Sequence, residues 1–232
     1  GTVEVFAGNN ADIDALGGNV SIGTAGTVPT DLQIGGQLDV DATGDILQND
    51  GSMQVGTFAQ FGWNSSPGNF VQDPAAGSGG DDALANDAIT AGDAVFIGVT
   101  NDILLGSDAS DNAIEASGVG GSYLVGGVDS VSVLLSAGRD IIQSGTGDIE
   151  GAGNALGVYA NAGRDLILND SGGILASGAG DADVILNAVR AIDIDQNDLG
   201  AFVQATDDVL IGQDFGALLP IPQTVAVSGD VT

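Results

Sequence analysis

The chain has 232 residues, 43% of them hydrophobic, and a formal net charge of −29. The hydrophobic content excludes a disordered acidic tail, and the absence of cysteine excludes disulfides, thiolate catalysis and zinc–thiolate sites. The charge repels nucleic-acid phosphates, so no nucleic-acid partner is expected, and the lack of an apolar run near ~18 residues predicts no direct membrane insertion.

Short apolar runs, separated by turn-forming residues, begin near the first residues of the chain. Residues 2–6 read as a strand, and residues 38–46 alternate apolar and polar side chains. Residues 57–87 differ, because they hold four of the ten aromatic residues and then a Gly- and Asp-rich stretch. We expect this segment to be an irregular, aromatic-containing insertion. Residues 95–103 then resume the alternation.

A clear internal repeat follows in residues 131–143, 156–168 and 182–194, which match position by position. The aligned positions include the chain's only basic residues, Arg139, Arg164 and Arg190. The period is therefore 25 and then 26 residues. Each unit alternates apolar with other residues over short runs, as a strand with one buried face does, and the residues between runs favour turns. Three short strands in each unit indicate one coil of an all-β, right-handed parallel β-helix.

Stacked coils place each strand about 4.8 Å from its copy one period later, so aligned apolar residues are predicted to face inward. This inward set is Val133, Leu135, Ile141, Val158, Leu166, Val184, Leu186 and Ile192. An antiparallel sandwich is the alternative, but it does not explain a repeat that includes turn residues.

The C-terminal part of the chain continues the pattern less regularly. Leu199 is expected to align with Ile149 and Ile174, and residues 203–209 read as a last copy after a short coil. We expect residues 1–217 to form a single rod, and residues 218–232 to form an extended linker with a terminal strand.

The Ala-Gly-Arg-Asp-Ile/Leu units at residues 137–141 and 162–166 resemble the repeats of filamentous haemagglutinin-type, two-partner-secretion-like adhesins. Looser copies extend the resemblance over roughly residues 18–215, apart from the insertion. The resemblance implies a secreted, extracellular β-helix on a bacterial cell surface, usually part of a long adhesin or of a biofilm-matrix fibre.

The arginines are predicted to stack at one corner of the β-helix, beside aspartates that follow them in the sequence. This structural Arg/Asp ladder consists of Arg139, Asp140, Arg164, Asp165 and Arg190. Asp45, Asp102 and Asp208 are expected at the same corner. Such a ladder neutralises a crowded row of carboxylates; the alternative is that the arginines bind an anionic sugar.

Calcium is the expected cofactor, because hard cations prefer several carboxylate and carbonyl oxygens in turns. Of the 32 acidic residues, 29 are aspartate, a residue typical of turns. The candidate ligands are Asp81, Asp82, Asp108, Asp111, Asp181, Asp183, Asp207 and Asp208. The alternative is a solvated acidic face that binds no specific ion.

The sequence favours a structural, non-enzymatic module of a secreted cell-surface adhesin, biofilm-matrix fibre or extracellular filament. No histidine or lysine is present to serve as a catalytic base. Strands near both ends suggest head-to-tail assembly with further copies of the chain. The alternative is a carbohydrate-binding or polysaccharide-cleaving β-helix that uses aspartates such as Asp39 and Asp41 on one sheet face. The aromatic segment either contacts surface carbohydrate or protein, or packs on the rod.

Overall fold

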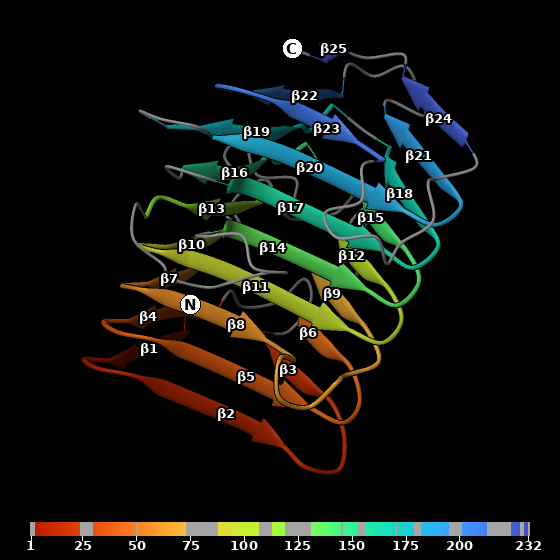
Figure 1. Cartoon of the computed structure of the whole chain (residues 1–232). Helices are drawn as coiled ribbons and strands as arrows, with labels where there is room; N and C mark the ends of the chain where they lie inside the picture. The colour runs from red at the N-terminus through yellow and green to blue at the C-terminus, as the bar shows by residue number, and fades with distance from the viewer. Residues whose placement is uncertain are drawn as a thin grey trace.

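The structure is a computed structural model, and it describes residues 3–23, 30–49, 51–72, 88–106, 113–118, 131–144, 146–152, 156–169, 171–178, 182–194, 201–212, 224–227 and 230–231. These residues form strands and turns that wind into a rod of stacked coils (Figure 1). Nowhere in these ranges is there a helix of the length and apolarity needed to cross a membrane.

Each coil contributes one strand to each of three sheets, which we name A, B and C. Sheet A contains β1 (Val3–Ala7), β4 (Thr30–Ile34), β7 (Met53–Val55), β10 (Ile89–Ala91), β13 (Ile114–Ala116), β16 (Ile149–Ala152), β19 (Ile174–Ser177), β22 (Phe202–Ala205) and β25 (Asp230–Val231). Sheet B contains β2 (Ala11–Ala15), β5 (Leu38–Ala42), β8 (Phe58–Phe61), β11 (Ala94–Val99), β14 (Val131–Ala137), β17 (Leu156–Ala162), β20 (Asp183–Ala188) and β23 (Val209–Ile211). Sheet C contains β3 (Val20–Ile22), β6 (Ile46–Gln48), β9 (Phe70–Gln72), β12 (Ile103–Leu105), β15 (Ile141–Gln143), β18 (Asp165–Leu168), β21 (Ala191–Ile194) and β24 (Thr224–Val227).

The strands follow one another along the chain in the order A, B, C, and neighbouring coils pair in parallel. Val133 lies beside Val158, and Val158 beside Val184, as the repeat predicts. The winding is right-handed, which is the hand that parallel crossover connections adopt almost always. The predicted fold, an all-β right-handed parallel β-helix, is confirmed.

The core runs along the axis of the rod between the three sheets. All eight residues of the predicted inward set are buried, each at most 2% exposed. Alternation along each strand places every second side chain in this core, so the aliphatic rows of successive coils stack on one another. Phe61 and Phe70 are also fully buried, with ring centroids 5.3 Å apart.

The aromatic segment at residues 57–87 differs from the insertion expected there. Phe58–Phe61 is the regular strand β8 of sheet B, and Phe70–Gln72 is the regular strand β9 of sheet C. Two of the aromatic side chains, Phe61 and Phe70, occupy inward positions that aliphatic residues occupy in other coils. This part of the segment is therefore a coil, while residues 73–87 lie outside the described residues.

The last coil also differs from the prediction. Val203 pairs with Ile174 in sheet A, whereas Leu199, the expected partner, lies outside the described residues. Val209 pairs with Val184 in sheet B, so the coil has the usual period of 25 residues and the predicted short coil is wrong. An alternating run has the same pattern on any of the three sheets, so periodicity alone does not assign it to one.

The expected strands near the two ends of the chain are present and pair within the chain. β1 pairs with β4, and β24 pairs with β21, both in register. The part of residues 218–232 that is described therefore continues the coils; residues 213–223 lie outside the described residues.

Candidate functional site

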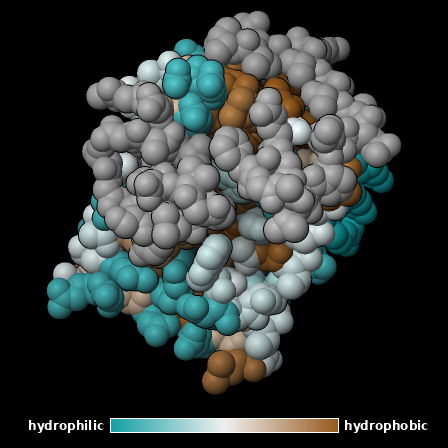
Figure 2. All heavy atoms as spheres, viewed as in Figure 1, coloured by the Kyte–Doolittle hydropathy of each residue, from teal (hydrophilic) through white to brown (hydrophobic). Residues whose placement is uncertain are grey.

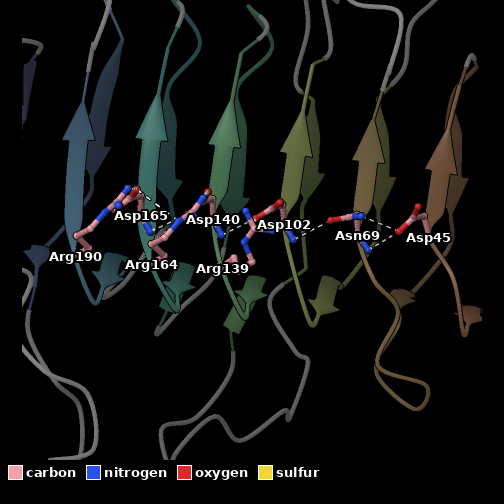
Figure 3. Close-up of polar contacts among 8 residues, drawn as sticks. All are labelled: Asp45, Asn69, Asp102, Arg139, Asp140, Arg164, Asp165 and Arg190. Carbon is pink, nitrogen blue, oxygen red and sulfur yellow. Dashed lines mark hydrogen bonds and ion pairs between the residues drawn. The ribbon is translucent and has the colours of Figure 1, made fainter.

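The turn between sheets B and C carries a continuous ladder of side-chain oxygens (Figure 3). At each step, an Asn or Asp oxygen accepts a hydrogen bond from the backbone N–H of the equivalent residue in the next coil, over 2.9–3.2 Å. The series runs from Asn19 through Asp45, Asn69, Asp102 and Asp140 to Asp165. These bonds satisfy backbone donors where the chain leaves one sheet for the next.

The arginines join the end of this ladder, each pairing with an aspartate of the preceding coil. The Arg164 Nε donates to Asp140 Oδ1 over 2.6 Å, and the Arg164 Nη2 donates to Asp140 Oδ2. Arg190 contacts Asp165 through the same two nitrogens. Arg139 makes only an ion pair with Asp102, with 3.6 Å between Nε and Oδ1.

These pairs neutralise carboxylates that the coil stacking brings together. The hydrogen bond from Arg164 holds the pKa of Asp140 below its usual value, although burial acts in the opposite direction. Asp140 and Asp165 are both buried, whereas the three arginine side chains are 40–61% exposed. The turn thus places five predicted ladder residues together and supports a structural role.

Asp208, expected at this corner, lies elsewhere, directly before β23 in the turn between sheets A and B. Its backbone N–H donates to Asp183 Oδ1 over 3.0 Å, and Asp207 lies beside it. Carboxylate oxygens of the three residues lie within 4.8 Å of one another. Three of the predicted calcium ligands therefore converge, from two successive coils. The other five, Asp81, Asp82, Asp108, Asp111 and Asp181, lie outside the described residues.

A second acidic group lies on the outer face of sheet B, in the first two coils. In register, Asp12 of β2 pairs with Asp39 of β5, and Asp14 pairs with Asp41. Figure 2 shows hydrophilic residues on this lower part of the molecule. Burial raises the pKa of Asp39, and the charges of the other three carboxylates raise it further, while a hydrogen bond with Gln60 lowers it.

The turn after β8 closes over two of these carboxylates. The Asn64 amide donates to Asp39 Oδ2 over 3.3 Å, and the Ser65 hydroxyl donates to Asp41 Oδ1 over 2.8 Å. The turn is tight, because Ser66 has a φ of 56°, a left-handed conformation that non-glycine residues rarely adopt. Such backbone strain persists where surrounding contacts enforce it.

This turn presents Trp63, the chain's only tryptophan, which is 51% exposed. Its ring centroid lies 5.7 Å from that of Phe96. Beside it is a hollow of about 230 Å³, lined in part by Gly98, Thr100 and Ser136. A half-exposed indole next to hydroxyl groups and carboxylates can stack on a sugar ring while polar groups bind its hydroxyls.

Sequence reasoning found the Arg/Asp series but missed its asparagines and the partners of the sheet B aspartates. Asn19 and Asn69 directly precede a strand of sheet C, and so do Asp45 and Asp102. Aligning all Asn and Asp residues before such strands would have found them. Asp12 carried no comparable signal, because its pairing with Asp39 depends on the register of two weak repeats.

Comparisons of the chain with protein-family models, with curated proteins and with solved structures found no match.

Proposed function

We propose that the chain is a structural, non-enzymatic module of a secreted cell-surface adhesin, biofilm-matrix fibre or extracellular filament. The observation that carries this proposal is the unbroken stack of in-register coils, held by three parallel sheets and by the turn ladder. A stack of this kind spaces its two ends apart along the rod axis. The resemblance of residues 137–141 and 162–166 to filamentous haemagglutinin-type repeats favours the same role.

Head-to-tail assembly is part of this proposal, and the burial of the core rows supports it. At the first coil, the inward residues Ala11, Ile13 and Ala15 are only partly buried, and so are Val209 and Ile211 in β23. Equivalent positions in the middle coils, such as Val133 and Leu135, are fully buried. Among the strands described, β2 pairs only with β5 and β23 only with β20. A second copy stacked end to end would continue sheet B and bury both rows.

Electron microscopy and light scattering test this assembly. The net charge of −29 opposes association, so filaments should lengthen as sodium chloride rises. Ile13→Asp places a carboxylate at one stacking surface and should leave monomers, while Asp12→Asn on the outer side of the same strand should not. Deletion of residues 218–232 tests whether the C-terminal strands form the connection. A wild-type chain that stays monomeric at every salt concentration would contradict the assembly.

Calcium belongs to the same proposal, with Asp183, Asp207 and Asp208 as its ligands. Their convergence within 4.8 Å supports it, since calcium takes several carboxylate oxygens.

Carbohydrate binding on the aspartate-rich face is the second candidate function. The position of Trp63, on a turn held by Asp39 and Asp41, favours it. Because Trp63 is the only tryptophan, its fluorescence reports directly on this face. A cationic oligosaccharide, hexaglucosamine, should change the fluorescence, and Asp14→Asn should weaken the effect, while Asp193→Asn in sheet C should not. Reducing-end release would reveal cleavage. An unchanged spectrum at saturating sugar would contradict this function.

A further inference from the structure

The outer face of sheet A carries a groove at its corner with sheet B. Its lining residues come from β1, β4, β7 and β10, from the turns after them, and from Ser117, which directly follows β13; its volume is about 600 Å³. Glycines form its floor: a Cβ added at Gly56 would lie 2.2 Å from the carbonyl oxygen of Gly35, and one at Gly92 would lie 2.1 Å from that of Gly56. The corner is therefore closely packed and free of side chains for several coils.

The described residues that line the groove are all uncharged. Although the chain has 32 acidic residues, none of those in the described ranges lines this groove. Its polar groups come from the outward row of sheet A, where Gln33 pairs with Gln54 and Gln54 pairs with Thr90. Gln33 and Gln54 are exposed, and within the described chain no hydrogen bond joins any of these three side chains to another residue. Their amides and hydroxyl are thus available to a ligand.

The side chain of Phe6, in the first coil, contributes an aromatic ring to the lining of the groove. Phe6 lies in the same outward row, pairing with Gln33, and it is 64% exposed. Exposed aromatic rings supply a large contact area at low entropic cost. Within the groove the row therefore consists of one ring, two amides and one hydroxyl, repeated at the spacing of the strands, about 4.8 Å. Beyond Thr90 the row continues with Glu115 of β13, which does not line the groove.

We propose that this groove binds an uncharged oligosaccharide along the rod axis. The amides and the hydroxyl both donate and accept hydrogen bonds, which suits a ligand rich in hydroxyl groups. The groove spans four strand spacings, roughly 19 Å, so the ligand is a chain of several sugar units rather than a single ring. Acidic sugars are repelled by the charge of the whole chain, and cationic sugars are drawn to the carboxylates of sheet B instead.

An extended peptide fits this groove less well. Peptides that add to a sheet gain their affinity from the free backbone groups of an edge strand. Apart from the edge strand β1, the strands beneath the groove have none to offer, because β4 pairs with both β1 and β7, and β7 pairs with both β4 and β10. A peptide added to the edge of β1 would lie parallel to that strand and not along the groove. Side chains alone must provide the contacts, as they do for sugars.

Calorimetric titration of the full chain with neutral hexasaccharides tests the proposal. The panel contains α- and β-linked hexamers of glucose, galactose, mannose and N-acetylglucosamine, with hexagalacturonate as the charged probe. At least one neutral member should bind at a single site with a Kd below about 1 mM, and hexagalacturonate should not bind. Phe6→Ala should weaken this binding about fivefold, through lost contact with the ring.

Gln54→Glu should weaken the binding at least about tenfold, because it removes an amide donor and adds a charge to the groove. The matched control is Gln204→Glu, which lies on the same outward face of sheet A in β22 and does not line the groove. Three results would overturn the proposal: no neutral hexasaccharide binding, equal loss in both variants, or tighter binding of a neutral Gly-Ser decapeptide than of every saccharide.

Discussion

Asp140 links three successive coils through its side chain and its backbone. Its own N–H donates to Asp102, and its Oδ1 accepts from the Asp165 N–H and from Arg164. A carboxylate that accepts both a backbone and a guanidinium donor forms stronger hydrogen bonds than a neutral group does. The position therefore allows the charge of the ladder to be tested separately from its hydrogen bonds.

Asp140→Asn retains an oxygen for the Asp165 N–H but removes the charge that faces Arg164. We expect the variant to lower the Tm by about 3 °C, a modest change because the Arg164 side chain is partly exposed. Asp102→Asn is the matched control, and its effect should be smaller, since Arg139 lies 3.6 Å from Asp102. Equal shifts in thermal melts of the two variants would contradict a role for the bidentate pair.

The raised pKa of Asp39 predicts how stability changes with pH. In the folded chain Asp39 binds its proton more readily than in the unfolded chain, where its pKa is about 3.9. Stability should therefore rise as the pH falls from neutrality through the raised pKa of Asp39. The pKa of the half-buried Asp148 is also raised by its loss of solvent, so this carboxyl acts in the same direction.

The contribution of Asp140 to stability changes with pH in the opposite direction. Because its folded pKa is lowered, its contribution is present above about pH 4 and is lost as the pH falls through the lowered value. Thermal melts between pH 7 and pH 2 should thus show maximal stability at mildly acidic pH. Asp39→Asn should reduce the rise in Tm between neutral pH and the pH of maximal stability. A Tm that falls steadily from pH 7 downward would contradict this prediction.

At the scale of the strands, the inward rows carry most of the packing. Leu186 of β20 is fully buried, and it pairs with Ala160 of β17 and with Ile211 of β23. In this row the small side chain of Ala160 lies between the larger ones of Leu135 and Leu186. Cavities in such a row are surrounded by fixed neighbours on both sides, so they collapse incompletely.

Leu186→Ala should therefore lower the free energy of unfolding by about 2–5 kcal/mol, the range typical of buried leucine truncation. Leu175→Ala is the control, because Leu175 of β19 lies on the outward face and is only half-buried. Its effect should be below about 1 kcal/mol. Urea denaturation measures both, and similar losses in the two variants would contradict the inward register.

At the scale of the whole molecule, charge opposes both folding and assembly. A net charge of −29 on a chain of 232 residues destabilises the compact state by self-repulsion. The three arginines relieve this repulsion at one corner, but the acidic groups on sheet B and near β23 have no such partner among the described arginine contacts. Cations from the solvent are then the remaining source of positive charge.

Calcium should raise the Tm more than sodium chloride does at the same ionic strength, since a ligand that binds only the folded state stabilises it. Asp207→Asn should remove most of the specific gain if Asp183, Asp207 and Asp208 hold the ion. Calorimetry in calcium and in chelator with matched salt measures the difference. Equal Tm values in the two solutions would mean that calcium acts only by general screening of charge and not at a specific site.

The strand period, the 25-residue coil and the inward set were all determined by the sequence. In a parallel β-helix each residue contacts its own copy one coil away, so the repeat alignment of Val133, Val158 and Val184 is itself a list of contacts. Turn residues repeat for the same reason, which is why the Arg/Asp series could be predicted from Arg139, Arg164 and Arg190.

Only the tertiary structure decided where the weak repeats belong and which acids meet. Val203 lies in sheet A, Phe61 lies in the core, and Asp183 meets Asp208 because the lengths of the intervening turns determine the register of each coil. Those lengths vary, and an alternating run has the same pattern on every sheet, so periodicity does not reveal them. The groove on sheet A also depends on this register, since it brings Phe6, Gln33 and Gln54 from three coils into one outward row.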